Sequence, residues 1–215
     1  MKDFSIPMAL TDFVPVLLFA WAGVLMMRDL YGKMSKGAFA IFAAGIIDVT
    51  CAGVLKALYK LLYAAGICDF APLSAMFFPV QAIGFLLSGL GLVAMLVYPQ
   101  GNTQENPQRK TVLHTAALPV FSGTFIFVGM MTAGIGMICV SMSVLAKKLG
   151  KPVLIIFFVL ALIAMLGMGY LSSHDFTKAS MNWIAQGTNI FGQGTLLWGT
   201  WLMHRAGLEK LELKK

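Results

Sequence analysis

Long apolar runs dominate this chain of 215 residues and restrict it to structures that a lipid bilayer can hold. A helix needs about 20 residues to cross the roughly 30 Å of hydrocarbon in a bilayer, and six runs approach or exceed that length. They cover residues 13–27, 38–65, 73–98, 115–146, 152–171 and 182–204. Backbone N–H and C=O groups in lipid must be paired within the segment, which favours helices over open sheets. The sequence therefore predicts an all-α, polytopic integral membrane protein with six transmembrane helices.

The composition agrees with this class of protein. Hydrophobic residues make up 59% of the chain and charged residues only 12%, which is too apolar for a water-soluble domain of this size. Because little polar chain separates the runs, we expect residues 1–215 to form a single transmembrane domain. The formal charge of +7 comes mainly from lysines and arginines in short connectors, where they can face anionic headgroups. We therefore expect the lipid bilayer, and not nucleic acid, as the charged partner.

The basic connectors are nearly balanced between the two sides, and they favour only slightly a topology with both termini in the cytoplasm. We expect a multi-pass protein of a prokaryotic cytoplasmic membrane, acting alone, as a homo-oligomer or with a partner subunit in the membrane. The three cysteines, Cys51, Cys68 and Cys139, show no CxxC spacing and no nearby histidine cluster. The sequence therefore predicts no disulfide framework, no metal site and no cofactor.

Two stretches ahead of the third and sixth runs resemble each other. CDFAPLSAMFFPVQ aligns with HDFTKASMNWIAQ, so that Gln81 pairs with Gln186, and Ser88 then falls opposite Gln193. This similarity suggests a repeat of two halves, 1–98 and 115–207, joined by a linker at 99–114. Because each half has an odd number of helices, the second copy is expected upside down in the membrane, as in many transporters and channels.

The last apolar run carries a stripe of polar side chains. Its members are Asn182, Gln186, Asn189, Gln193, Thr200 and His204. At about 100° per residue they fall within roughly 60° of one another on a helix, over about 33 Å of rise. One or two amides would only hold helices together through cross-helix hydrogen bonds. A row of this length favours a seam lined by water or ligand, with Gln81, Ser88 and Asp48 as its neighbours on other helices.

Asp48 lies about ten residues inside the second run, near the expected middle of the bilayer. An ionised carboxylate there costs several kcal/mol unless it is paired or hydrated. It is either a proton- or cation-coupling group that faces the stripe, or a protonated, hydrogen-bonded structural acid.

Lys56 and Lys60 follow Asp48 on the same helix, near its expected end. Both ammonium groups can extend to the membrane interface along their apolar stems. Alternatively, Lys56 lines the path and attracts an anion. Asp69 and Asp175 each precede a membrane helix and are expected to cap its first N–H groups. Gly84 and Ser88 in the third run and Gly129 and Ala133 in the fourth have the spacing that allows close helix packing.

The motifs that usually accompany enzymatic chemistry are absent from the sequence: it has no phosphate-binding GxxxxGKS loop, no GxSxG and no HExxH. We therefore expect a small transporter or channel for a small polar solute or ion. It would have a path along the last helix, with Asp48 as the coupling charge. One alternative is a ligand-binding membrane subunit or sensor that acts with a partner; in outline, the chain resembles the substrate-capture subunits of vitamin uptake systems. A second alternative is an intramembrane enzyme for a lipid-like substrate, which requires His114, His174 or His204 within hydrogen-bond reach of a carboxylate.

Overall fold

The computed structural model describes residues 5–99, 124–171 and 179–213, and within these ranges the regular structure is entirely helical. The α-helices are α1 (Ile6–Thr11), α2 (Phe13–Leu30), α3 (Lys36–Ala64), α4 (Ala71–Ala75), α5 (Phe77–Val97), α6 (Thr124–Lys148), α7 (Ile155–Leu171) and α8 (Ala179–Arg205). Short 3-10 turns, η1 (Tyr31–Lys33), η2 (Pro152–Leu154) and η3 (Leu208–Lys210), follow α2, precede α7 and follow α8. Each predicted run therefore corresponds to one long helix. The linker predicted at 99–114 lies outside the described residues, apart from Pro99.

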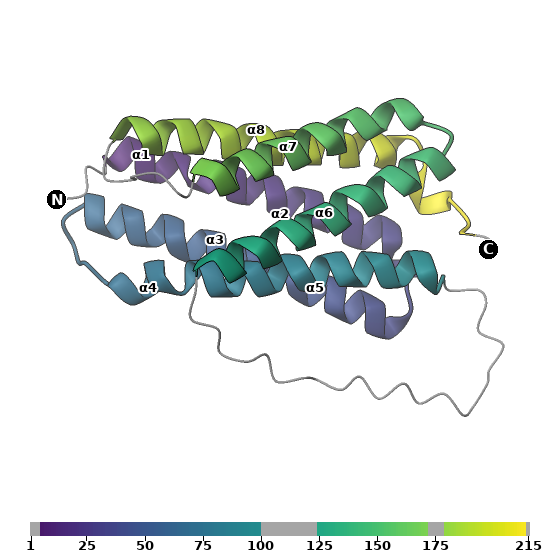
Figure 1. Ribbon diagram of the computed structural model, residues 1–215, viewed down its shortest axis with the longest axis horizontal. Helices are drawn as coiled ribbons and strands as arrows, with labels where there is room; N and C mark the ends of the chain where they lie inside the picture. The colour runs from purple at the N-terminus through teal and green to yellow at the C-terminus, as the bar shows by residue number, and fades with distance from the viewer. Residues whose placement is uncertain (1–4, 100–123, 172–178, 214–215) are drawn as a thin grey trace.

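Prolines explain why the first and third long helices begin with a separate short helix. Pro15 has no N–H to donate to the carbonyl of Thr11, and the helix is interrupted between them, at Asp12. Pro79 stands in the same relation to Ala75, and the second interruption falls at Met76. Both interruptions lie at the same end of the bundle, where α1 and α4 are found (Figure 1).

Five helical segments among the described residues are long and apolar enough to cross a membrane. They are Ile6–Lys33, Lys36–Ala64, Ala71–Val97, Ile126–Lys148 and Pro152–Leu171. The sixth long helix, α8, is 27 residues long but is not among them, because its amide side chains make it less apolar. It nevertheless lies within the same bundle, beside α7 and α2.

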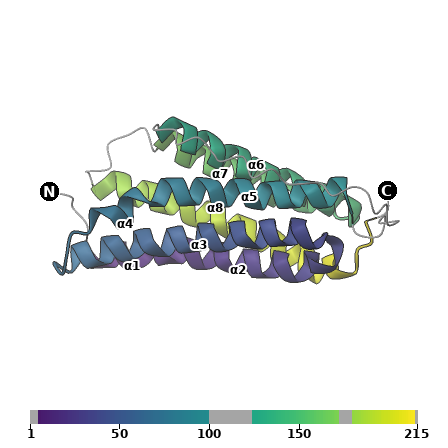
Figure 2. The same ribbon diagram turned by 90° about the horizontal axis from the view of Figure 1, so that it is seen from below.

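The six long helices form a closed ring in the order α2, α3, α5, α6, α7, α8, in which each helix packs mainly against its two neighbours. Seen from below, α6 and α7 lie on one side, α2 and α3 on the other, and α5 and α8 between them (Figure 2). One continuous apolar core, with members from all six helices, fills much of the interior. Phe19 of α2 and Phe85 of α5 meet edge to face within it, with ring centroids 5.5 Å apart.

Close contacts establish that α5 and α6 run in the same direction. Gly134 faces the backbone of Phe85, and Gly89, one turn further along α5, faces Met137, one turn further along α6. The same holds for α2 and α8, which run parallel from one end of the bundle to the other (Figure 1). Each half, α2–α3–α5 and α6–α7–α8, therefore runs forward, back and forward.

The predicted inversion of the second half is therefore wrong for these helices, because the two halves point the same way. The prediction assumed that the linker joins helix ends on one side. Instead, the end of α5 and the start of α6 lie at opposite ends of the bundle, so the chain between Val97 and Thr124 connects these ends. For the same reason the described chain starts at one end and finishes at the other, and not with both termini on one side as expected (Figure 1). Whether the sequence similarity itself reflects a repeat remains a prediction.

Small residues permit the closest contacts in the ring. A side chain on Gly45 of α3 would overlap the backbone of Gly84 and Ser88 on α5. The predicted close packing at Gly84 and Ser88 is thus confirmed. Gly129 of α6 has nothing within 4 Å of the position of a Cβ, and Gly134 takes the packing role in that helix instead.

Candidate functional site

The polar stripe of α8 faces the interior of the bundle. Four of its members are buried: Asn182, Gln186, Gln193 and Thr200. The opposite face exposes Trp183, Ile184, Phe191 and Trp198, each with about half of its surface accessible. The helix therefore presents an apolar surface outward and its hydrogen-bonding groups inward, which suits a helix with lipid on one side and protein on the other.

Toward one end of the stripe, Gln186 forms hydrogen bonds to the segment where α1 ends and α2 begins. Its side-chain nitrogen donates to Asp12 Oδ1 at 2.9 Å and to the carbonyl of Met8 at 3.0 Å. The other carboxylate oxygen of Asp12 lies 2.6 Å from Nζ of Lys60, and both side chains of this ion pair are largely shielded from solvent. Three helices, α3, α8 and the α1–α2 unit, therefore meet at one carboxylate.

At the other end of the bundle, His204 binds α2. Its Nδ1 lies 2.9 Å from Asp29 Oδ1 and 3.0 Å from Oδ2, and the Asp29 side chain has no exposed surface. Between the two ends, the hydroxyl of Thr200 donates to the carbonyl of Leu196 in its own helix. Thr200 is therefore satisfied locally and does not line an open path.

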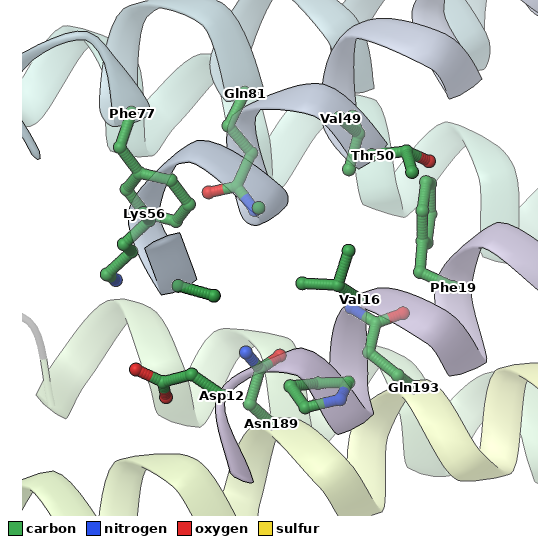
Figure 3. A pocket seen from close by; sticks show the side chains of 13 residues that line it. Asp12, Val16, Phe19, Val49, Thr50, Lys56, Phe77, Gln81, Asn189 and Gln193 are labelled. Atoms are coloured by element: carbon green, nitrogen blue, oxygen red, sulfur yellow. The ribbon is translucent and has the colours of Figure 1, made fainter. Parts of the chain in front are cut away.

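A cavity of about 60 Å³ lies between α2, α3, α5 and α8, beside the middle of the stripe. Its polar lining consists of Asp12, Thr50, Lys56, Gln81, Asn189 and Gln193. Its apolar lining consists of Pro15, Val16, Phe19, Val49, Gly53, Ala57 and Phe77. Figure 3 shows the side chains from the different helices around a shared space. This volume is enough for a few water molecules or for one small ion or solute.

Lys56 is among the residues that line this cavity. Its Nζ lies over the ring of Phe77, 3.8 Å from the centroid (Figure 3). It has no hydrogen-bond or ion-pair partner among the described residues. Lys56 therefore contributes to the cavity wall, whereas Lys60 is engaged with Asp12.

The amide side chains around the cavity are only partly satisfied. The side-chain oxygens of Gln81 and Gln193 are buried without a hydrogen-bond partner, as is the oxygen of Gln186 beside them. The nitrogen of Gln193 reaches only the sulfur of Met165, at 3.8 Å. A buried amide group without a partner costs about 1 to 3 kcal/mol. The lining is therefore suited to a guest that supplies the missing hydrogen bonds.

Besides Thr200, two more of the predicted path residues lie away from the cavity. Asp48 is half-buried, does not line the cavity and has no hydrogen-bond or ion-pair partner among the described residues. Ser88 is buried in the contact between α3 and α5, where its hydroxyl donates to the carbonyl of Gly84. Of the predicted set, the structure therefore brings together Lys56, Gln81, Asn189 and Gln193 at the cavity, with Gln186 at its edge and Asn182 buried further along the same face.

Asp12 and Asp29 were missed by sequence reasoning, although both carry the polar contacts of α8. Each stands at a margin of the first apolar run, where a carboxylate is easily taken for a boundary residue. The signal that could have identified them is the stripe itself: a membrane-long row of donors requires acceptors on a neighbouring helix. Asp69 was expected to cap a helix, but it accepts a hydrogen bond from the hydroxyl of Tyr59 at 3.0 Å, and Phe70 occupies the N-cap position.

Within the part of the chain that the structure describes, no group of three or more histidine, cysteine, aspartate or glutamate side chains could hold a metal ion. His114, His174 and Asp175 lie outside these residues. Comparison with protein-family models, with curated proteins and with solved structures gives no match.

Proposed function

We propose that this chain is an integral membrane protein that binds a small polar solute or ion in the cavity and carries it across the bilayer. Its outer surface supports the membrane part of the proposal. Large apolar side chains are exposed on every long helix, among them Leu17, Trp21, Ile47, Leu90, Val140, Ile163 and Trp198. Such a surface is far larger than the apolar patches of water-soluble monomers and suits contact with lipid. With its polar stripe turned inward, α8 serves as a further crossing beside the five more apolar segments.

One observation carries the binding part of the proposal: an otherwise apolar bundle holds a cavity with a lysine and three amide side chains on its wall. Simple helix adhesion would pair these groups with one another across the helix contacts. Instead, Gln81 and Gln193 keep buried oxygens without a partner in the described part of the chain, and the Lys56 ammonium lies against the rings of Phe77 and Phe78. The cavity therefore combines free space with polar groups that are able to bind a guest.

The surroundings of the cavity favour a carrier over an open channel. On one side, Phe19 lines the cavity and stacks against Phe85, and the apolar core continues behind this pair. On the other side, Gln186 and Lys60 are both bound to Asp12. A solute that moves along α8 must separate one of these two contacts at a time, which is the requirement for alternating access to a central site. We transfer the coupling role expected of Asp48 to Asp12, since Asp12 belongs to the barrier next to the cavity.

A ligand-binding subunit that acts with a partner is the second candidate. The same two contacts favour it, because they can hold a ligand at the site without releasing it to the far side of the bundle. The two candidates differ in a direct way: a carrier moves solute in vesicles by itself, whereas a capture subunit binds solute and shows no flux until the partner is added.

The enzyme alternative has less support. His204 and Asp29 meet within hydrogen-bond distance, as that alternative requires. However, the carboxylate has no exposed surface, and neither residue lines the cavity. A substrate could reach the partly exposed imidazole of His204 but not the Asp29 carboxylate.

The proposal can be tested with purified protein in lipid vesicles. We expect uptake of a panel of small labelled solutes and ions to exceed that of empty vesicles for at least one member of the panel. Gln193→Leu should strongly reduce this uptake, because it removes an amide from the cavity wall. Thr195→Val is the matched control on the same helix, since the Thr195 hydroxyl donates within α8. Equal uptake by both variants, with normal folding, would count against the cavity as the transport site.

A further inference from the structure

We propose that the cavity is a binding site for a small monovalent anion, with the Lys56 ammonium as its counter-charge. This inference rests on the proposed function and names the class of solute that the site accepts. It concerns small anions such as chloride, nitrate or formate, which match a cavity of about 60 Å³.

One of the charges at the cavity has no opposite charge paired with it. Asp12 lines the cavity, but its carboxylate is already paired with Lys60, 2.6 Å away, and accepts a further hydrogen bond from Gln186. Lys56 makes no salt bridge among the described residues, because Asp12, the carboxylate that shares its cavity, is the one bound to Lys60. Its contact with the face of Phe77 offers far less compensation than a counter-ion would. An uncompensated ammonium inside a bundle is costly unless an anion or water accompanies it. The local excess of one positive charge therefore favours an anionic guest.

The remaining lining groups can serve an anion once their amides turn, since the buried side-chain atoms without a partner around the cavity are oxygens in this structure. Gln81, Asn189 and Gln193 each carry an NH₂ group, and an amide can turn to present either its donors or its oxygen. Three amide donors and one ammonium can surround a small anion, and a water beside it can donate to the amide oxygens that lack a partner. A cation in the same place would be repelled by Lys56, and its only carboxylate would be one that Lys60 already neutralises.

The test measures anion binding to the full chain in detergent, at constant ionic strength, with gluconate as the background anion. Chloride, nitrate, formate and sulfate replace gluconate in separate titrations. Thermal unfolding reports stabilisation by a bound ligand, and equilibrium binding of labelled chloride reports affinity directly. We expect the small monovalent anions to raise the unfolding temperature in a saturable way, and sulfate to have no such effect.

Variants link the binding to the cavity. Lys56→Met should weaken chloride binding about 30-fold or more, as expected when one partner of a buried charged contact is removed. Lys56→Arg keeps the charge and should retain binding. The matched control is Lys148→Met, which removes a lysine from the exposed end of α6. Gln193→Leu is a second cavity variant that keeps the test informative if Lys56→Met does not fold.

The outcomes separate this inference from the proposed function. Chloride binding that depends on Lys56, together with chloride flux in vesicles, supports both. Binding that depends on Lys56 without flux supports the anion site and overturns the carrier in favour of the capture subunit. Flux of a neutral solute or a cation without saturable anion binding overturns the anion site and leaves the carrier standing. Equal chloride binding by Lys56→Met and Lys148→Met also overturns the anion site.

Discussion

Nδ1 of His204 lies within 3.0 Å of both carboxylate oxygens of Asp29, and this contact fastens the last turn of α8 to the last turn of α2. An ionised carboxylate can only accept, so Nδ1 is the donor. The segment that follows α8 closes over the same place: Lys33 donates to the carbonyl of Glu209 at 2.7 Å, and Leu208 is buried in the core. One end of the bundle is thus held by a polar contact within an apolar shell, and the cavity lies toward the other end.

This contact predicts a specific pattern of stabilities. His204→Leu leaves the buried carboxylate of Asp29 without its donor and should lower the free energy of unfolding by roughly 2 to 4 kcal/mol, somewhat below a fully buried pair because the His204 side chain is partly exposed. Asp29→Leu should be similarly harmful. The double variant should be more stable than either single variant, because two apolar side chains can pack where a broken pair cannot. Denaturation of the parent, the two single variants and the double variant in a common detergent gives a double-mutant cycle. Additive effects of the two substitutions would contradict a direct interaction.

The hydrogen bonds of Gln186, at the end of the bundle nearer the cavity, predict a smaller effect on stability than the contact between His204 and Asp29. Gln186→Leu removes the donor that serves both Asp12 and the carbonyl of Met8, and should cost about 1 to 3 kcal/mol in unfolding free energy. Thr188→Val is the matched control, since the Thr188 hydroxyl donates to Ile184 within α8. Thermal unfolding of both variants gives the comparison. If the two shift the unfolding temperature equally, the bond to Asp12 does not hold α8 in place.

The sequence predicted the positions of the helices well, because each long apolar run has one physical outcome in lipid. It also predicted that the stripe of α8 faces inward and that Gln81 and Lys56 could accompany it at a common space. These inferences need only helical periodicity and the cost of unpaired polar groups. Asn189 and Gln193 line the cavity for the same reason that they were selected: they share a face with Gln186.

Tertiary relationships were not accessible in the same way. Asp48 stands inside an apolar run and Asp12 at the margin of one, and only the packing of α3 against α2 decides which of them reaches the cavity. The direction of α6 depends on whether the chain between Val97 and Thr124 returns to the starting end of the bundle, and no periodicity encodes that choice. The interruption at Asp12 could have been inferred from Pro15, whose ring removes the bond to Thr11.

Filling the cavity should abolish transport without unfolding the protein. Ala57 is buried and lines the cavity, so Ala57→Leu places three additional carbon atoms in the space that a guest would occupy. We expect flux in vesicles to fall to the level of empty vesicles, and stability to change by less than about 2 kcal/mol because the added carbons enter an existing void. Ala40→Leu, on the exposed face of the same helix, should leave flux unchanged. Undiminished flux through Ala57→Leu would place the path elsewhere.

The parallel contact of α5 and α6 predicts different tolerance at two glycines of one helix. A Cβ on Gly134 would overlap the backbone of Phe85, so Gly134→Ala should force the helices apart and cost about 1 to 3 kcal/mol. Gly136 has nothing within 4 Å of its Cβ position, and Gly136→Ala should be neutral or stabilise the helix by up to about 1 kcal/mol. The unfolding temperatures of the two variants measure this difference in stability. The reverse order of stability would contradict the parallel arrangement of these helices.

Asp12 and Asp48 provide the sharpest test of which carboxylate couples to transport. Asp12→Asn breaks the pair with Lys60 at the barrier beside the cavity, and should slow flux about tenfold or more, equivalent to at least about 1.4 kcal/mol in the barrier. Asp48→Asn changes a carboxylate that does not line the cavity, and should leave flux within about twofold of the parent, a barrier change of less than about 0.5 kcal/mol. Both substitutions keep the size of the side chain, so each serves as the control for the other. Initial rates in vesicles of matched protein content measure the difference. Loss of flux in Asp48→Asn alone would return the coupling role to the middle of α3 and show that the solute follows a route on the flank of that helix.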